Sequence, residues 1–309
     1  MKKILVTGSI AYDNLLTFNG DFSDSILPEK IDNLSVSFQA DQHEVHYGGC
    51  STNIGYSIRL LGDMPLIFAV AGNDFEKYEK WLKANDISDE YIRIDESRNT
   101  AAAYILTDKK HSQICIFSTG AMQSADKFDD VSLSGVDADF AIISPGMLSC
   151  SLHFAEECMK NKIPYIFDPG QSIPDLSVDA LLAMIDGARG VIMNGYEADM
   201  LAKKLSMSFF DIAKRTPFVL KTLGADGVEI HESGKSKVVV PAISGLDVKE
   251  PTGCGDAFRS GFLHGFVNGE SLDKSCAMGN TSASFVVEQF GTQNHKFSKE
   301  EFEARLGKI

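Results

Sequence analysis

The chain has 309 residues, of which 44% are hydrophobic, and it carries a formal net charge of −14 at pH 7. This length and composition allow a large buried core in one α/β domain or two. The acidic balance, with a pI near 4.9, argues against nucleic acid and anionic membranes as partners.

Six cysteines are scattered along the chain without a CxxC pair or a dense framework. This pattern is typical of reduced thiols and predicts a cytoplasmic protein. Met1-Lys2-Lys3 leads directly into an apolar strand, and no apolar run reaches the ~18 residues that a membrane-spanning helix needs. We therefore expect neither a signal peptide nor a membrane span.

Most of the chain alternates between short apolar strands and amphipathic helices. A strand at 4–7 comes first, then a helix at 51–61 that Gly62 closes, a strand at 66–70 and a helix that Asp74 caps and that runs to Asn85. This rhythm predicts a doubly wound, largely parallel sheet with helices on both faces. The later strands are expected at 140–144, 165–167, 191–193, 218–222, 228–231 and 237–240, and the later helices at 151–161, 178–187, 196–205, 255–267, 271–289 and 298–306.

Two blocks of sequence interrupt this alternation. The first, 14–47, contains short apolar pieces separated by Gly, Asp, Ser and Pro, including one at 34–38. The second contains two strand patterns joined by the polar turn 108–111. Such patterns predict antiparallel strands, and we expect one small sheet that projects from the main body as a lid. We find no linker or repeat, so the chain is expected to form a single domain, 1–309, with a lid made by about 14–47 and 98–118.

The segment EPTGCGDAFR, residues 250–259, is the most informative part of the sequence. Gly253, Cys254, Gly255 and Asp256 stand where an irregular segment becomes an apolar helix. Their backbone N–H groups would lie at the positive end of that helix and form an anion site, which an acidic chain needs if it is to bind a nucleotide. The Asp256 carboxylate would add a proton acceptor, and the combination favours phosphoryl transfer to a hydroxyl. The alternative is a glycine-rich helix start with an aspartate cap.

Two further groups follow the first expected strand. The carboxylate of Asp13 can accept two hydrogen bonds from a vicinal diol such as that of a ribose. Gly48 and Gly49 allow close backbone approach at the start of the first helix, and Asn53 lies one turn further on. The plain alternatives are a solvated turn aspartate and an N-cap at 51 or 52.

Asn194 and Glu197 follow a later strand and could orient a Mg²⁺-water shell at a triphosphate. Since Asn and Glu at this spacing are also common capping residues, the helix start alone would explain them. In an open α/β sheet, ligands bind beyond the carboxyl ends of the strands, and such polar groups follow most strands here. Their shared position favours a real site.

Nucleotide and catalytic motifs of other folds are absent from the sequence. Residues 234–236, Gly-Lys-Ser, resemble the end of a P-loop, but Glu229 stands where its first glycine belongs and no helix follows. There is no GxGxxG, HExxH or GxSxG, and no Cys/His spacing that suggests zinc. A dinucleotide-binding oxidoreductase on a similar sheet thus becomes a weak alternative.

Taken together, these segments resemble the ribokinase-like (PfkB) carbohydrate kinase family, whose fold is a doubly wound α/β core with a small β-sheet lid. They occur in family order and span most of the chain. Within the family the chain looks most like the bacterial-type adenosine kinases, which favours a nucleoside over a free sugar. The family matches are at 8–13, 48–53, 194–197, 222–227 and 252–256, and the more specific ones at 6–13, 22–29, 36–38, 71–75, 251–259 and 291–293.

The resemblance implies a role for each matching residue. Asp13 and Asn53 would hold the ribose hydroxyls, Phe117 would stack on the purine from the lid, and Asp256 would be the base toward the 5′-hydroxyl. Glu197 would act on Mg²⁺ through water. The remaining residues implied are Ser9, Ser37, Gly49 and Gln171 in the nucleoside pocket, Asn194, Thr222, Gly224 and Gly227 at the ATP phosphates, and Gly253, Cys254 and Gly255 in the anion hole.

Three residues depart from the family pattern. Glu250 replaces an aspartate beside the monovalent-cation loop, which leaves potassium activation open. Cys254 replaces a small Ala or Ser and is tolerable because the backbone N–H does the work. Ala103 replaces a second aromatic opposite Phe117, which removes a contact worth on the order of 1 kcal/mol.

The expected activity is therefore the ATP- and Mg²⁺-dependent phosphorylation of adenosine to AMP, as in purine salvage. The alternatives are a kinase for inosine, guanosine or cytidine, a kinase for a sugar such as ribose or fructose, and a non-catalytic nucleoside sensor. An intact Asp256 argues against the sensor. Because an uncovered sheet edge invites pairing, we also expect a homodimer through the lid.

Overall fold

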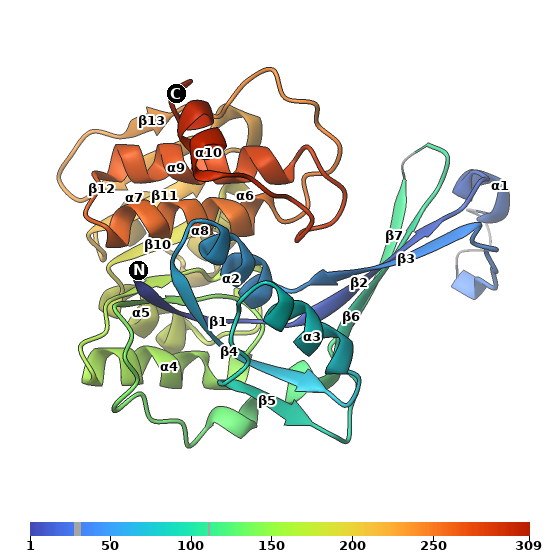
Figure 1. Cartoon of the computed structure of the whole chain (residues 1–309), viewed down its shortest axis with the longest axis horizontal. Coiled ribbons are helices and arrows are strands. Elements are labelled where there is room, and N and C mark those ends of the chain that lie inside the picture. Colours follow the sequence, from blue (N-terminus) through green and yellow to red (C-terminus); the bar gives the residue numbers. More distant parts are fainter. Residues whose placement is uncertain (28–31, 111) are drawn as a thin grey trace.

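The computed structural model describes residues 1–27, 32–110 and 112–309. Its main body is a nine-stranded sheet in the order β13-β12-β11-β10-β9-β8-β1-β4-β5, with helices on both faces (Figure 1). All neighbours from β5 to β11 are parallel, and β12 and β13 are antiparallel additions. The strands are β1 Lys3–Thr7, β4 Met64–Gly72, β5 Ile92–Asp95, β8 Phe140–Ile143, β9 Tyr165–Phe167, β10 Gly190–Asn194, β11 Phe218–Thr222, β12 Val228–Glu232 and β13 Val238–Val240.

The central strands are buried on both sides, which explains their unbroken apolar runs. In β1, Ile4 and Val6 belong to one core cluster with residues of α2 and α8, whereas Leu5 belongs to another with residues of α4, α5 and α6. No helix of the described residues is both long and apolar enough to cross a bilayer. The helices are α1 Phe22–Ser25, α2 Cys50–Leu60, α3 Glu76–Ala84, α4 Leu148–Lys160, α5 Val178–Gly187, α6 Gly195–Leu205, α7 Phe209–Ala213, α8 Cys254–Val267, α9 Leu272–Val286 and α10 Lys299–Leu306, with 3-10 turns η2 Gly120–Phe128, η3 Gly170–Ser172 and η4 Gly224–Asp226.

A second, four-stranded sheet projects from the main body (Figure 1). Its order is β3-β2-β6-β7, with strands β2 Ala11–Thr17, β3 Gln42–Gly48, β6 Ala101–Thr107 and β7 Gln113–Ser118. Two antiparallel pairs, β2 with β3 and β6 with β7, are joined by parallel pairing of β2 with β6. The expected α/β core and small projecting sheet are thus confirmed.

Some expected elements differ from the observed ones. Residues 34–38 are not a strand; Phe38 packs instead against Phe18 and Phe22, each at 5.1 Å between ring centroids. Asp74 does not cap α3. Its carboxylate instead accepts a hydrogen bond from the N–H of Thr100 at 2.8 Å, next to the start of β6. Residues 28 and 29 of the family-like segment 22–29, and residue 111 of the predicted turn, lie outside the described residues.

Candidate functional site

Many of the predicted site residues lie where the carboxyl ends of the parallel strands meet the first turns of α2 and α8. Asn194 ends β10 and is in register with Thr222, which ends the neighbouring strand β11. Asp168 follows β9 directly. The edge of the sheet predicted from the sequence is thus the edge at which these polar groups collect.

The centre of the site is a hydrogen bond between two helices. Asn53 in the first turn of α2 donates from Nδ2 to Oδ2 of Asp256, in the first turn of α8, at 2.9 Å. The N-cap of α8 is Gly253, with φ +81°, and a Cβ there would stand 2.9 Å from Cγ2 of Thr292. Asp256 therefore does not cap its own helix, so the alternative of an aspartate cap is wrong.

The start of α8 leaves backbone donors free. The N–H of Cys254 donates to the carbonyl of Pro251 at 3.2 Å. The N–H groups of Gly253, Gly255 and Asp256 have no acceptor among the described residues. They lie at the positive end of a 14-residue helix, where an anion is favoured. The anion site that the sequence predicts is therefore geometrically available, with Cys254 contributing least.

Burial raises the pKa of Asp256, while Arg259 and the hydrogen bond from Asn53 oppose this rise. A carboxylate with a raised pKa is a stronger proton acceptor than an ordinary aspartate, provided that it remains ionised. Asp256 is half-buried, so one side of it remains accessible. The residue is suited to accept a proton from a hydroxyl.

An ion pair between Asp168 and Arg259 lies beneath Asp256. Arg259 donates from one Nη atom to Oδ1 of Asp168 at 2.6 Å, and its Nε lies against the other oxygen. The second Nη atom donates to the carbonyl of Gly255 at 2.9 Å. Both side chains are buried. Burial raises the pKa of Asp168 to about 6, so it is ionised and paired with Arg259 at neutral pH. Neither residue was assigned a role from the sequence.

Ser9 and Gly49 hold the start of α2 against β1. The carbonyl of Ser9 accepts the N–H of Ser51 at 3.1 Å, and its Oγ accepts the N–H of Cys50 at 3.0 Å. Gly49 is the N-cap of α2 with φ +99°, and a Cβ there would lie 2.6 Å from the Ser9 carbonyl oxygen. An N-cap at 51 or 52 is therefore wrong, because both residues lie inside the helix.

Asp13 belongs to the lid sheet and faces the main body. It is in register with His46 on β3 and Ala103 on β6, and Ala103 with Phe117 on β7, so these four side chains form one row on one face. Asp13 is half-buried over Gly48, and burial, together with Glu250, raises its pKa to about 6. It is not a solvated turn residue, so that alternative is wrong.

The same row of side chains would form the purine side of the predicted pocket. Phe117 is 47% exposed, and its cross-strand partner Ala103 adds no second aromatic ring. The other two predicted pocket residues are also exposed, Ser37 in an irregular segment and Gln171 in the 3-10 turn η3. Phe117 therefore stands opposite an alanine in this row, and its stacking on a base stays a prediction.

The predicted phosphate and magnesium residues are less distinctive. Asn194 and Glu197 form a capping box, with Asn194 Oδ1 accepting the Glu197 N–H at 2.8 Å and Glu197 Oε2 accepting the Asn194 N–H at 2.7 Å. The capping alternative is therefore confirmed for both. Gly224 has φ +60° and an open surrounding, whereas Gly227 is buried with its Cα against the carbonyl of Val240.

Metal-ligating side chains are sparse. Within 1–27, 32–110 and 112–309, no three His, Cys, Asp or Glu side chains are placed to hold an ion together. At the predicted monovalent-cation loop, the Glu250 carboxylate accepts the N–H of Gly291 at 3.0 Å.

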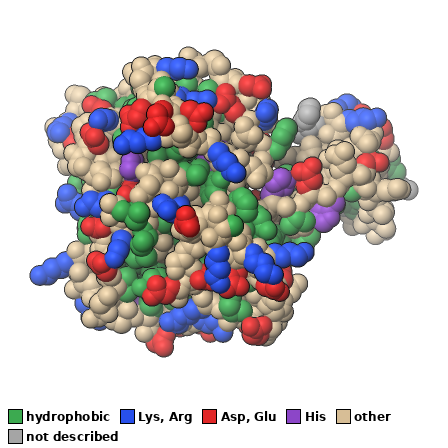
Figure 2. Space-filling view, in the orientation of Figure 1, with side chains coloured by type: hydrophobic (Ala, Val, Ile, Leu, Met, Phe, Trp, Pro, Cys, Tyr) green, Lys and Arg blue, Asp and Glu red, His purple; other side chains and the backbone are tan. Residues whose placement is uncertain are grey.

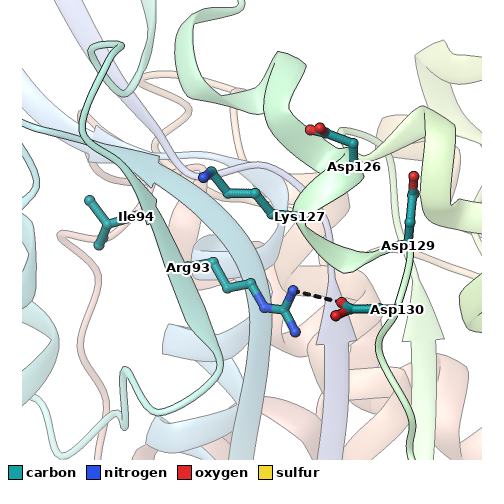
Figure 3. Close-up of a pocket in the computed structure, with 6 residues that line it drawn as sticks. All are labelled: Arg93, Ile94, Asp126, Lys127, Asp129 and Asp130. Carbon is teal, nitrogen blue, oxygen red and sulfur yellow. Dashed lines mark hydrogen bonds and ion pairs between the residues drawn. The ribbon is translucent and has the colours of Figure 1, made fainter.

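A groove of about 410 Å³ lies elsewhere, between β5 and η2 (Figure 3). Arg93 crosses it, donating to Asp130 at 3.3 Å with its guanidinium 4.4 Å from the ring centroid of Phe128. None of the predicted site residues lines it. Because it lies apart from the predicted site residues, we do not assign the function to it.

The chain is similar to known proteins over nearly its whole length. The family model described as pfkB family carbohydrate kinase matches residues 2–299. A nucleoside kinase of Methanocaldococcus jannaschii is 31% identical over 96% of this chain and 93% of its own. Its crystal structure covers 100% of this chain and 99% of that one with a TM-score of 0.89. Burkholderia thailandensis nucleoside kinase in complex with inosine is 30% identical, with a TM-score of 0.87 over 98% of this chain and 96% of that one.

Proposed function

Because the chain belongs to the PfkB family of carbohydrate kinases and transfers a phosphoryl group to an alcohol, we propose that its acceptor is the 5′-hydroxyl of a nucleoside, with ATP as donor. The curated relatives that cover most of the chain at 31% and 26% identity are both nucleoside kinases. The relatives described as adenosine kinase are 24–25% identical. Within the nucleosides, adenosine is our first choice and inosine the second.

The observation that carries this proposal is the Asn53–Asp256 hydrogen bond at 2.9 Å. It joins a residue suited to hold a ribose hydroxyl to a residue suited to accept a proton. A ribose held by Asn53 and Asp13 would present its 5′-oxygen close to Asp256. The free backbone N–H groups at the start of α8 would donate hydrogen bonds to the oxygens of the phosphoryl group during its transfer.

The chain's own residues would act as follows. Asp13 and Asn53 orient the ribose, and the lid face that carries Asp13 and Phe117 covers the nucleoside and keeps water away. Asp256 accepts the hydroxyl proton as the oxygen forms its bond to the γ-phosphorus of ATP and the bond from that phosphorus to ADP breaks, so that ADP leaves. Mg²⁺, when bound with ATP, would neutralise charge on the phosphates, with Glu197 acting through water.

The decisive experiment measures ADP release with ATP and Mg²⁺, with and without potassium. Adenosine, inosine, guanosine, cytidine, ribose and fructose are compared as acceptors. Turnover with nucleosides far above that with the sugars supports the proposal, and adenosine above inosine supports our first choice. Higher turnover with ribose or fructose would overturn the nucleoside assignment, and no turnover with any of the six would favour a sensor.

Activity is expected to fall as the pH is lowered through about 6. Asp13 must be ionised to accept from two ribose hydroxyls, and burial together with the neighbouring Glu250 raises its pKa to about 6. Protonation below that value removes one acceptor, so kcat/KM for the nucleoside should decline on the acid side. The measurement is a pH–rate profile of the wild type and Asp13→Asn. An unchanged acid limb in the variant would exclude Asp13 as its source.

We also propose that two copies pair through the lid face turned away from the site. One cross-strand row on that face contains three exposed apolar side chains, Val45, Tyr104 and Ile116, which are 56%, 44% and 64% exposed, and the buried Asn14 stands between the first two. On the face seen in Figure 2, by contrast, basic and acidic side chains are interspersed over the main body. An exposed apolar row on a four-stranded sheet with two open edges is suited to a second copy of itself.

Ile116→Glu is expected to convert a dimer to a monomer, because pairing would bury a carboxylate at the most exposed apolar position of the row, on the edge strand β7. Light scattering coupled to size-exclusion chromatography measures this. Ile94→Glu is the matched control and should leave the mass unchanged, since Ile94 is exposed but lies on β5, the edge strand of the other, nine-stranded sheet. A monomeric wild type at micromolar concentration would contradict the proposal.

Three expectations stay predictions: the cytoplasmic location, the lid boundaries at about 14–47 and 98–118, and potassium activation. All six cysteines are free thiols. The strands of the projecting sheet lie at 11–17, 42–48, 101–107 and 113–118.

A further inference from the structure

The proposed base is the end of a buried chain of hydrogen bonds that begins on a different helix. Nε1 of Trp81, in α3, donates to Oε1 of Gln293 at 2.9 Å. Nε2 of Gln293 donates to Oδ1 of Asn53 at 2.9 Å, and Nδ2 of Asn53 donates to Asp256. Gln293 is 2% exposed and Asn53 5% exposed, so water does not replace these contacts.

Each link in this chain fixes the orientation of the next. An indole N–H can only donate, so Trp81 determines which end of the Gln293 amide is the acceptor. The Nε2 atom of Gln293 then faces Asn53 and the hydroxyl of Tyr78, which lies 2.7 Å away and is itself held by the Gly48 carbonyl at 2.8 Å. Asn53 must therefore direct Oδ1 toward Gln293 and Nδ2 toward Asp256.

Thr292 is a second possible donor to Asn53, but it does not replace Gln293. Oγ1 of Thr292 lies 2.9 Å from Asn53 Oδ1 and 3.0 Å from the carbonyl oxygen of Tyr47. A hydroxyl has one hydrogen and can fully donate to only one of the two oxygens. Gln293 is therefore the donor that is committed to Asn53.

We propose that Gln293, oriented by Trp81, is a positioning residue for phosphoryl transfer, because it sets the amide of Asn53 so that its N–H points at Asp256. Without it, the Asn53 amide could reverse and present an oxygen to the carboxylate. The nucleoside would then lose a fixed hydroxyl contact and Asp256 would lose a donor. This inference rests on the proposed function, since it assigns Gln293 to that same site.

The charged and titratable groups around Asp256 come from several elements. They are Asp13 on β2, Cys50 on α2, Asp168 after β9, Glu197 on α6, and Cys254 and Arg259 on α8. Gln293 touches none of them directly in the described structure. A change of the Asp256 pKa in a Gln293 variant would therefore be transmitted through Asn53.

Gln293→Met tests the inference by removing both the acceptor and the donors at similar volume. We expect KM for the nucleoside to rise about tenfold or more while KM for ATP stays the same, because misplacement of a reacting group is costly. We also expect the pKa of the Asp256 carboxyl, followed by ¹³C NMR, to rise. Trp81→Phe keeps an aromatic ring against Tyr47 but loses the N–H together with the five-membered ring of the indole, and it should shift both quantities in the same direction by less.

Gln123→Met is the matched control, since Gln123 also donates and accepts through its amide but lies exposed in η2. It should leave both quantities unchanged. If Gln293→Met lowered only thermal stability and kept the wild-type nucleoside KM and Asp256 pKa, Gln293 would be merely structural and the inference would be overturned. The NMR titration requires no turnover, so it decides this point even if the wild type proves to be inactive toward nucleosides and the proposed function fails.

Discussion

Asp256→Asn is expected to lower kcat by about 10²- to 10⁴-fold, the range typical of a lost general base. An asparagine oxygen can still accept the hydrogen bond that Asn53 donates at 2.9 Å, so the ribose contacts are expected to remain. Affinity for the nucleoside should therefore change little, and the loss should appear in kcat rather than in the dissociation constant. Steady-state kinetics and calorimetric titration with the nucleoside measure the two quantities separately.

Asp256→Asn should not lower the free energy of unfolding, because the pKa of Asp256 is raised in the folded protein. Burial raises the pKa of Asp256 in the folded protein above its unfolded value. The folded state then binds more protons than the unfolded state, so this residue's contribution to stability is lost as the pH rises through the folded pKa. Asparagine does not ionise, and at pH 8 the variant is expected to be at least as stable as the wild type.

Asp63→Asn is the matched control for Asp256→Asn. Asp63 is also a buried aspartate in contact with α8, but through His264 near the other end of that helix, at 2.6 Å between Nδ1 and Oδ2. This variant should lose stability because the hydrogen bonds from His264 and the Lys2 N–H lower the pKa of Asp63. It should keep the wild-type kcat. Near-normal turnover in Asp256→Asn would show that the base assignment is wrong.

Local patterns in the sequence predicted the elements of the core well. Helix α5, Val178–Gly187, has the predicted bounds, because an apolar face and the cap at Ser177 are both encoded within the segment. Strand β5, Ile92–Asp95, was not predicted, because four residues with alternating polarity do not stand out from a loop. This segment forms a strand because it pairs with β4, and the local sequence does not encode that contact.

The site was predicted at the level of motifs and not at the level of contacts. Asp13, Asn53 and Asp256 were identified because each sits in a short motif, and the structure brings them to one place. The partners of Asp256 are distant in sequence: Asn53 is separated from it by 203 positions, and from its own donor Gln293 by 240. Spacing along one chain carries no signal for such pairs.

The ion pair of Asp168 and Arg259 is the other contact that the sequence did not reveal, and breaking it should have the largest effect on stability. Arg259→Met would leave the Asp168 carboxylate buried without a partner, which costs about 3–5 kcal/mol in comparable cases. Unfolding in urea, monitored by circular dichroism, measures the loss. Arg215→Met, which removes a surface pair with Asp186, is the control and should cost about 0–1 kcal/mol.

The pH dependence separates a lost ion pair from a lost packing contact. Without Arg259 the pKa of Asp168, already raised to about 6 by burial, should rise further. A folded pKa above the unfolded value means that the contribution of Asp168 is lost as the pH rises through it, so the variant should be most destabilised at pH 8 and should recover toward pH 5. Adding Asp168→Asn to Arg259→Met removes the uncompensated charge and should restore part of the stability at pH 8. An equal loss at pH 5 and pH 8, or no gain from the second substitution, would mean that Arg259 stabilises the start of α8 by packing and through the Gly255 carbonyl rather than by its charge.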